Sequence, residues 1–431
     1  MGRKVFISTL GTGFYQEGKY SSNDTGFVSS STRFIQQATA EYLSIDRWTD
    51  KDAAIFLLTE KARRENWSVN ARKDRKGDEV SYIGLEFVWK EMSLPVTVRD
   101  LSIPEGKNEE EIWDIFSTLY KELQDGDELY FDVTHGFRNL PMLVIVLGNY
   151  SKFLKNTTVR SITYGGFENK DKATGYAPII NLLPLSMLQD WTFAAADYLQ
   201  NGNVNDLKSL CISSITPVLA SSKGKDENAV SLRKFLKTLE TYTEEVKSCR
   251  GRDLYSKATV CNLYGQIGYI GETIIAPMNP IIEKMRDSFT PYVDGDELQN
   301  LYLSAQWCFT KGLYQSAITI LQEAIVTGIC VRTGLGNIGD PDVRKLVTDA
   351  IWYSYYKINN EESNFSGALS SEAILADIFF RNKENITKYS SLSDLRNDFN
   401  HSGMRKQSLS PRTLQAGIAD MLEYFRPLFN L

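Results

Sequence analysis

Short apolar runs alternate with amphipathic stretches over the first part of the chain. Six runs have the length and composition of buried strands, and they lie at residues 4–10, 53–58, 94–98, 128–133, 159–164 and 179–183. Helical spacing separates several of them, at residues 33–43, 108–123 and 139–150, while residues 14–32 are polar and predict a long loop or hairpin. Alternating strands and helices favour an α/β domain with a largely parallel, Rossmann-like sheet, which we place at residues 1–188.

The pattern changes near residue 186, where strand signals fade and only helical spacing remains. Helices are expected at residues 187–199, 227–247, 260–275, 281–289, 298–310, 314–329, 342–356, 371–382, 391–401 and after Ser410-Pro411. The small, polar and charged residues 221–227 are typical of a flexible connection. We therefore expect a helical connecting region at 189–300, which carries no recognised motif, and an all-α bundle at 301–431.

One of these helices ends in a candidate catalytic histidine, His401. Its apolar stripe recurs at three and four residues and consists of Leu392, Leu395 and Phe399. Ser402-Gly403 supplies a stop signal, so His401 lies at the helix C-terminus, with Asn397 on the same polar face and Arg396 on its flank. A solvated helix end with a surface histidine is the alternative interpretation.

The other histidine of the chain, His135, follows the strand that ends near Asp132. A helical pattern begins just after it, with Asn139 as the expected cap and Pro141 in the first turn. In open α/β sheets, such strand-to-helix loops hold the ligand. A structural histidine satisfied by backbone groups is the alternative, but both histidines occupy polar positions beside turns, which favours two functional histidines.

A glycine turn, Gly11-Thr12-Gly13, follows the first strand directly. Glycines allow the backbone to approach a phosphate closely, although an ordinary tight turn has the same composition. Gln16 stands where a dinucleotide fingerprint needs its third glycine, and no Gly-Lys-Ser/Thr follows, which argues against a dehydrogenase or a P-loop ATPase. If the first and fourth strands are neighbours, this turn and the Asp132 loop share one crevice at the carboxyl edge of the sheet.

Two motifs resemble those of known families. Asp132-Val133-Thr134-His135-Gly136 resembles the Asp-x-Thr-His-Gly signature of a CRISPR-associated family, and residues 7–15 resemble that family's opening strand and glycine turn. Arg396-Asn397 followed by His401 resembles the Arg-x4-His motif of HEPN ribonucleases. The order also agrees, with a ligand-sensing CARF domain first and a HEPN domain last. The resemblance implies a type III CRISPR accessory ribonuclease, activated by cyclic oligoadenylate, for which we expect the four-membered ring, cyclic tetraadenylate.

This resemblance gives the crevice a set of expected ligand contacts. Hydroxyl and amide side chains would bond bases and riboses, His135 and Arg138 would meet phosphates, and either Tyr15 or Tyr164 would stack on adenine. For the two tyrosines, core packing is an equal alternative. The full expected set is Thr9, Gly11, Thr12, Gly13, Tyr15, Asp132, Thr134, His135, Gly136, Arg138, Asn139 and Tyr164.

The ribonuclease motif predicts chemistry without a metal. The RNA 2′-hydroxyl would attack the adjacent phosphate, with His401 as general acid or base, Arg396 stabilising the phosphorane and Asn397 orienting His401 or the phosphate. Arg396 and His401 lie about 140° apart around one helix, so the two side chains of a single protomer do not point to the same place. Two helices meeting across a two-fold axis would bring both pairs together, and we expect a homodimer or a larger homo-oligomer.

Composition narrows the partners. The net charge of −6 argues against a broad basic surface, so single-stranded RNA would bind at a small local site. The five cysteines show no metal-ligand spacing with either histidine, and we expect neither a metal nor a cofactor. The chain shows no basic-then-apolar leader and no apolar run close to a membrane span, which predicts a cytoplasmic protein without membrane contact.

Three other functions are compatible with the same motifs. A CARF-type ligand-responsive transcription regulator would need a basic recognition helix, which the sequence does not offer. A purely structural helical domain could use the Arg396 face for dimer contacts. The CARF pocket could also act as a ring nuclease that degrades cyclic oligoadenylate, which the sequence does not decide.

Overall fold

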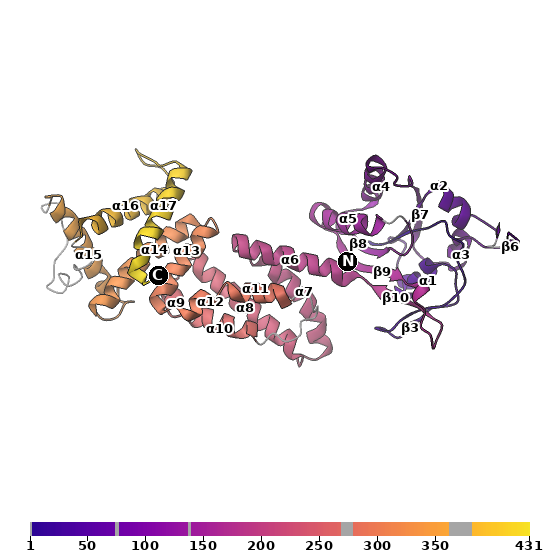
Figure 1. Ribbon diagram of the computed structural model, residues 1–431, viewed down its shortest axis with the longest axis horizontal. Helices are drawn as coiled ribbons and strands as arrows, with labels where there is room; N and C mark the ends of the chain where they lie inside the picture. Colours follow the sequence, from indigo (N-terminus) through magenta and orange to yellow (C-terminus); the bar gives the residue numbers. More distant parts are fainter. Residues whose placement is uncertain (1, 74–76, 137–138, 269–278, 362–381) are drawn as a thin grey trace. The chain divides into compact units, whose positions relative to one another are not determined.

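The chain divides at residue 187 into two units, Met1–Met187 and Leu188–Leu431. The computed structural model describes residues 2–73, 77–136, 139–268, 279–361 and 382–431 (Figure 1). Residues 189–300 and 301–431, which the sequence predicted as separate regions, belong to the same unit.

An eight-stranded sheet forms the centre of the N-terminal unit, with strand order β3-β2-β10-β9-β8-β1-β4-β7. Its five consecutive parallel strands are β9 (Thr158–Gly165), β8 (Glu128–Asp132), β1 (Lys4–Thr9), β4 (Ala53–Leu58) and β7 (Thr97–Ser102). β10 (Ala177–Asn181) runs antiparallel to β9, and the hairpin of β2 (Tyr20–Ser22) and β3 (Phe27–Val28) extends that edge. The sheet is therefore mixed, and the predicted parallel arrangement is confirmed for the five strands that carry β1 and β8.

Both faces of this sheet are buried. Side chains alternate along β1, so that Val5 and Ile7 join one apolar core while Phe6 joins another, where its ring stacks on Trp89 at 5.9 Å. The first core contains residues of α4 (Glu109–Glu122) and α5 (Leu140–Lys155), and the second contains residues of α3 (Leu85–Glu91). α1 (Ile35–Tyr42) covers the β2–β10 end. A sheet with two buried faces explains the near-continuous apolar runs of β1 and β4.

Several expected boundaries were wrong. The strand expected at 94–98 is β7, which starts three residues later, because it is an exposed edge strand of polar residues, while Val96 packs into the core before it. Asn139 precedes α5, but its side chain makes no cap hydrogen bond. The sequence also gave no sign of α2 (Glu60–Ala62), the π-helical turn η2 (Arg63–Trp67) or the hairpin of β5 (Ala71–Lys73) and β6 (Glu79–Ser81).

In the C-terminal unit, the described secondary-structure elements are all helices. The boundary between the units lies inside α6 (Leu183–Asn201). The following helices are α7 (Asn205–Ser221), α8 (Glu227–Lys247), α9 (Gly251–Tyr255), α10 (Ala258–Gly268), α11 (Asn279–Asp287), α12 (Thr290–Asp294), α13 (Glu297–Thr310), α14 (Tyr314–Thr333), α15 (Pro341–Ile358), α16 (Lys383–Asn400) and α17 (Pro411–Phe425). α7 was missed because Pro217 and its small polar residues weaken the helical pattern. Residues 371–381 of the helix expected at 371–382, and residues 269–275 of that expected at 260–275, lie outside the described residues.

The core helix of this unit is α14. It contacts α13, α15, α16 and α17, and an unbroken run from Ala324 to Cys330 is buried. Contrary to the expectation that no run approaches a membrane span, α14 is long and apolar enough by composition, with a mean hydropathy of 1.2 over 18 residues. Because 67% of that window is buried inside the unit, we interpret α14 as a core helix, a class that meets the same criterion.

Candidate functional site

Asp132 organises the loop at the carboxyl end of β8. Its carboxylate is buried and accepts hydrogen bonds from Ser8 Oγ at 2.7 Å, from the Thr134 backbone N–H at 3.1 Å and from Thr134 Oγ1 at 2.5 Å. Ser8 is its register partner on β1, which confirms that the two strands are neighbours. Burial raises the pKa of Asp132, although these hydrogen bonds oppose the shift. Its side chain thus joins β1 to the loop.

Thr134 continues this network toward the next strand. Its hydroxyl oxygen accepts a hydrogen bond from the Gly165 backbone N–H at 2.7 Å, at the end of β9. On the other side, the Thr9 hydroxyl donates to the carbonyl of His135. The loop after β8 is therefore tied to both neighbouring strands, β1 and β9.

Only glycine fits at position 136, because the backbone there passes close to Thr9 and Leu140. The φ of Gly136, +126°, lies in a region that side chains rarely adopt, and a Cβ there would meet Thr9 Oγ1 at 2.8 Å and Leu140 Cδ2 at 2.9 Å. The glycine of the motif thus allows the chain to pass between β1 and the start of α5.

His135 and Tyr15 bring the loop and the glycine turn together. Their rings stack with centroids 4.3 Å apart and planes 21° from parallel. The Gly11 backbone N–H donates to the Tyr15 hydroxyl oxygen at 2.9 Å, and a Cβ at Gly11 would lie 2.7 Å from that oxygen. Burial lowers the pKa of His135 to about 4 and raises that of Tyr15. The imidazole is therefore neutral at physiological pH, and a bound anion would favour its protonation.

Two residues that the sequence did not single out hold the glycine turn. The fully buried Asn66 donates its amide N–H groups to the carbonyls of Gly11 at 2.8 Å and Gly13 at 2.9 Å. Arg72 donates to the same Gly13 carbonyl at 2.8 Å and to Asn66 Oδ1 at 2.8 Å. The Tyr82 hydroxyl also donates to Asn66 Oδ1, at 2.7 Å. These contacts come from η2, β5 and the segment after β6, and no local signal in the sequence marks them.

Arg72 makes further contacts beside the turn. Its guanidinium also pairs with Glu65 at 2.9 Å and lies over the rings of Phe14, at 5.5 Å, and Tyr82, at 5.2 Å. A neutral histidine and a held arginine beside a glycine turn with an exposed Thr12 and Gly13 make a site suited to a phosphate-containing ligand.

The remaining expected ligand residues that the structure describes do not share the contacts of the Asp132 and His135 side chains. Thr12 is exposed, and its carbonyl accepts a hydrogen bond from Arg72 at 3.3 Å. Tyr164 is 38% exposed on β9, where alternation places it on the opposite face from Thr163. Asn139 is partly buried just before α5, and Arg138 lies outside the described residues.

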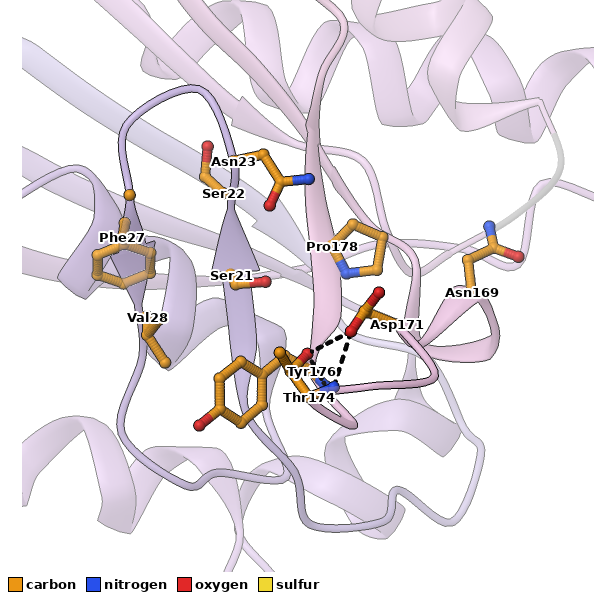
Figure 2. Close-up of a pocket in the computed structure, with 11 residues that line it drawn as sticks. Ser21, Ser22, Asn23, Phe27, Val28, Asn169, Asp171, Thr174, Tyr176 and Pro178 are labelled. Atoms are coloured by element: carbon orange, nitrogen blue, oxygen red, sulfur yellow. Dashed lines mark hydrogen bonds between the residues drawn. The ribbon is translucent and has the colours of Figure 1, made fainter.

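A cavity of about 610 Å³ lies elsewhere in the N-terminal unit (Figure 2). It is lined by the β2–β3 hairpin and by the segment from Asn169 to Pro178, in which Asp171 accepts hydrogen bonds from the Thr174 backbone at 2.7 Å and hydroxyl at 2.9 Å. The expected ligand residues are not among those that line it, so this cavity is separate from the glycine turn and the Asp132 loop.

In the C-terminal unit, α16 ends where the sequence predicted. His401 is its C-cap residue and is exposed, and Ser402 and Gly403 follow with positive φ values of 52° and 69°. Asn397 is exposed one turn earlier, and its carbonyl accepts the His401 backbone N–H at 2.9 Å. His401 and Asn397 are therefore accessible to a substrate.

Arg396 points to a different neighbour. It is partly buried, and its Nη1 donates to Gln322 Oε1 of α14 at 3.2 Å. Its Nε is buried and has no hydrogen-bond partner in the described part of the chain. A hydrogen bond between the Arg396 and His401 side chains is likewise not found in the described part of the chain, in agreement with the 140° that separates them around the helix.

His, Cys, Asp and Glu side chains are the usual metal ligands in proteins. Across the described ranges, groups of three or more His, Cys, Asp or Glu side chains placed to hold a metal ion are not found. The described cysteines are all free thiols, and Cys211, Cys308 and Cys330 are buried. The two candidate sites therefore consist of hydrogen-bonding and cationic side chains.

Comparison with known proteins identifies what the N-terminal part of the chain is similar to. Residues 5–168 match the family described as CRISPR system endoribonuclease Csx1, CARF domain. The chain is also 26% identical over 236 residues to CRISPR-associated protein MJ1674 of Methanocaldococcus jannaschii. That match covers 54% of this chain and 34% of the relative, so it spans about a third of the relative's length. Together the comparisons support a CRISPR-associated CARF protein, with the CARF domain in the N-terminal unit.

Proposed function

We propose that this protein is a HEPN-type endoribonuclease that cuts single-stranded RNA when its CARF domain binds cyclic oligoadenylate, as part of type III CRISPR defence. The observation that carries the proposal is the exposed end of α16, where Asn397 and His401 lie on one accessible face of an all-helical unit and Arg396 lies on its flank. This unit follows a CARF domain in the same chain. A sensor joined to a helical unit with this motif is suited to ligand-controlled cleavage.

The proposed chemistry uses three side chains. His401 moves the proton of the attacking 2′-hydroxyl or of the leaving 5′-oxygen, because an imidazole changes its charge near neutral pH. Arg396 stabilises the extra negative charge on the pentacoordinate phosphorus, and Asn397 orients the phosphate or His401. The products would carry a 2′,3′-cyclic phosphate and a 5′-hydroxyl.

The proposed activator site lies between the glycine turn and the Asp132 loop. Gly11, Gly13, His135 and Thr134 surround it, and Asn66 and Arg72 hold the turn that presents it. Cyclic tetraadenylate has four phosphates and four adenines arranged with two-fold symmetry. A symmetric ring is best matched by two copies of this site.

A dimer would supply those two copies, and the surface of α5 supports it. This helix starts directly after the Asp132 loop, and it exposes Met142 (71%), Val146 (53%), Tyr150 (45%) and Phe153 (86%). Their spacing of four, four and three residues places them on one face of the helix. Exposed large apolar side chains in one stripe are typical of protein–protein contacts, and we infer that a second copy of the chain covers this stripe.

The proposal is tested by RNA cleavage in EDTA. Full-length protein is mixed with labelled single-stranded RNA, with and without cyclic tetraadenylate, and the ends of the products are identified. We expect activator-dependent cleavage that survives chelation and leaves 2′,3′-cyclic phosphates. His401→Ala should abolish it, whereas Met404→Ala, at a position that is 89% exposed in the same loop, should not. Complete inhibition by EDTA that magnesium reverses would contradict the mechanism.

A further inference from the structure

The polar contacts of Arg396 differ from those of Arg344, whose partner is the neighbouring residue of α14. Glu323 of α14 pairs with Arg344 of α15 at 2.5 Å, and Arg344 also donates to Thr327 Oγ1 and to the Ile338 carbonyl, each at 3.0 Å. The charge of Arg344 is thus neutralised by a carboxylate and its guanidinium is held on several sides. Arg344 and Glu323 therefore form a structural ion pair.

Arg396 of α16 meets a neutral group instead, because its partner on α14 is Gln322, the residue before Glu323. Its hydrogen bond goes to the amide oxygen of Gln322 at 3.2 Å, and it has no carboxylate partner among the described residues. A neutral acceptor fixes the direction of a guanidinium without cancelling its charge. The positive charge of Arg396 therefore stays available to an anion.

The orientation of the Gln322 amide is determined by its neighbours. Its Nε2 donates to the hydroxyls of Tyr389, at 3.3 Å, and Ser393, at 3.1 Å, both on α16 and both buried. An arginine can only donate, so the amide oxygen must face Arg396. Three contacts from one side chain thus lock a single amide orientation against α16.

We propose that Gln322 is the positioning residue of the ribonuclease site: it aims the Arg396 guanidinium with a neutral acceptor and keeps its charge free for the phosphate. This inference rests on the proposed ribonuclease function, and it adds to it a residue on another helix that the motif does not contain. A positioning role for Gln322 also explains why the contact between α14 and α16 includes polar side chains, Gln322, Ser393 and Arg396, beside the apolar core.

Two substitutions separate positioning from simple packing. Gln322→Leu removes the acceptor, whereas Gln322→Glu keeps an acceptor for Arg396 and for the two hydroxyls but adds a negative charge. Both should lower kcat for activated RNA cleavage about 10- to 100-fold, the range expected for one hydrogen bond to a charged group, with little change in KM. A structural role alone predicts that Gln322→Glu keeps wild-type kcat, because the acceptor is retained.

The matched controls are Gln415→Leu and Gln415→Glu, at an exposed position of α17, which should leave kcat unchanged. Thermal unfolding and RNA affinity, the latter measured in a His401→Ala background, check folding and substrate binding. Wild-type kcat in either Gln322 variant overturns the inference, and if the leucine variant fails to fold, the glutamate variant decides. If Arg396→Ala and His401→Ala abolish cleavage while both Gln322 variants retain it, only this inference fails. A wild-type protein that cuts no RNA with any cyclic oligoadenylate overturns the proposed function and this inference together.

Discussion

Asn66→Leu should loosen the glycine turn more than any change at an exposed turn residue. The substitution removes two hydrogen bonds to the Gly11 and Gly13 carbonyls and two that Asn66 Oδ1 accepts from Tyr82 and Arg72. A neutral hydrogen bond contributes about 1 kcal/mol and one to a charged group about 2 kcal/mol, so the three neutral bonds and the one from Arg72 together contribute about 5 kcal/mol of unfolding free energy. The side chain is fully buried, so water does not replace these bonds inside the site.

Asn66→Asp is the informative partner of this variant. It keeps the shape and the acceptor for Tyr82 and Arg72, but it replaces the amide N–H groups with an oxygen that faces two carbonyls. If the turn presents the activator, calorimetric titration of cyclic tetraadenylate should show about 10- to 100-fold weaker binding for both variants. Asn70→Leu, at an exposed position of the same segment, should bind normally. Wild-type affinity in a folded Asn66→Leu protein would refute the assignment of the activator site to this turn.

Three further outcomes follow from the same geometry. Phe153→Asp places a charge in the exposed α5 stripe, and light scattering should then show folded monomers; a persistent dimer would exclude this surface. Burial lowers the pKa of His135 to about 4, so the unfolded chain binds a proton that the folded chain does not, and unfolding free energy should fall by at most about 3 kcal/mol as pH drops from about 6.5 toward 4. Because a bound phosphate favours the charged imidazole, activator affinity should rise over the same interval, an effect that His135→Gln should abolish. Gly136→Ala should lower stability by about 2 kcal/mol or more and weaken activator binding, whereas Gly126→Ala, which also has positive φ but open space around it, should affect stability alone.

Local patterns in the sequence were sufficient for the elements that carry the motifs. The apolar runs of β1 and β8 and the turn residues after them placed Gly11 and Asp132 at strand ends, and the register between Ser8 and Asp132 shows that the ends adjoin. The stripe of Leu392 and Leu395 and the Ser402-Gly403 stop predicted the end of α16. In both cases, the signal lies within about ten residues of the element it describes.

The residues that support the two sites were not predictable in this way. Asn66 and Arg72 come from a π-helical turn and a small hairpin, and they act on a turn more than fifty residues earlier in the chain. Gln322 reads as one more polar residue of an apolar helix, and its contact with Arg396 spans 74 positions. The antiparallel β10 and the β2–β3 extension were likewise set by tertiary pairing. Single-residue patterns carry no information about such distant partners.

An activator bound at one histidine should control cleavage at the other. The most direct test measures activator affinity and RNA cleavage side by side, as a function of cyclic tetraadenylate concentration, for the wild type, His135→Ala and His401→Ala. We predict low basal cleavage, His401→Ala with near-normal activator affinity but no cleavage, and His135→Ala with weakened affinity and cleavage that high activator concentration partly restores. Cleavage by His401→Ala, or equally fast cleavage by the wild type without any cyclic nucleotide, would contradict the account.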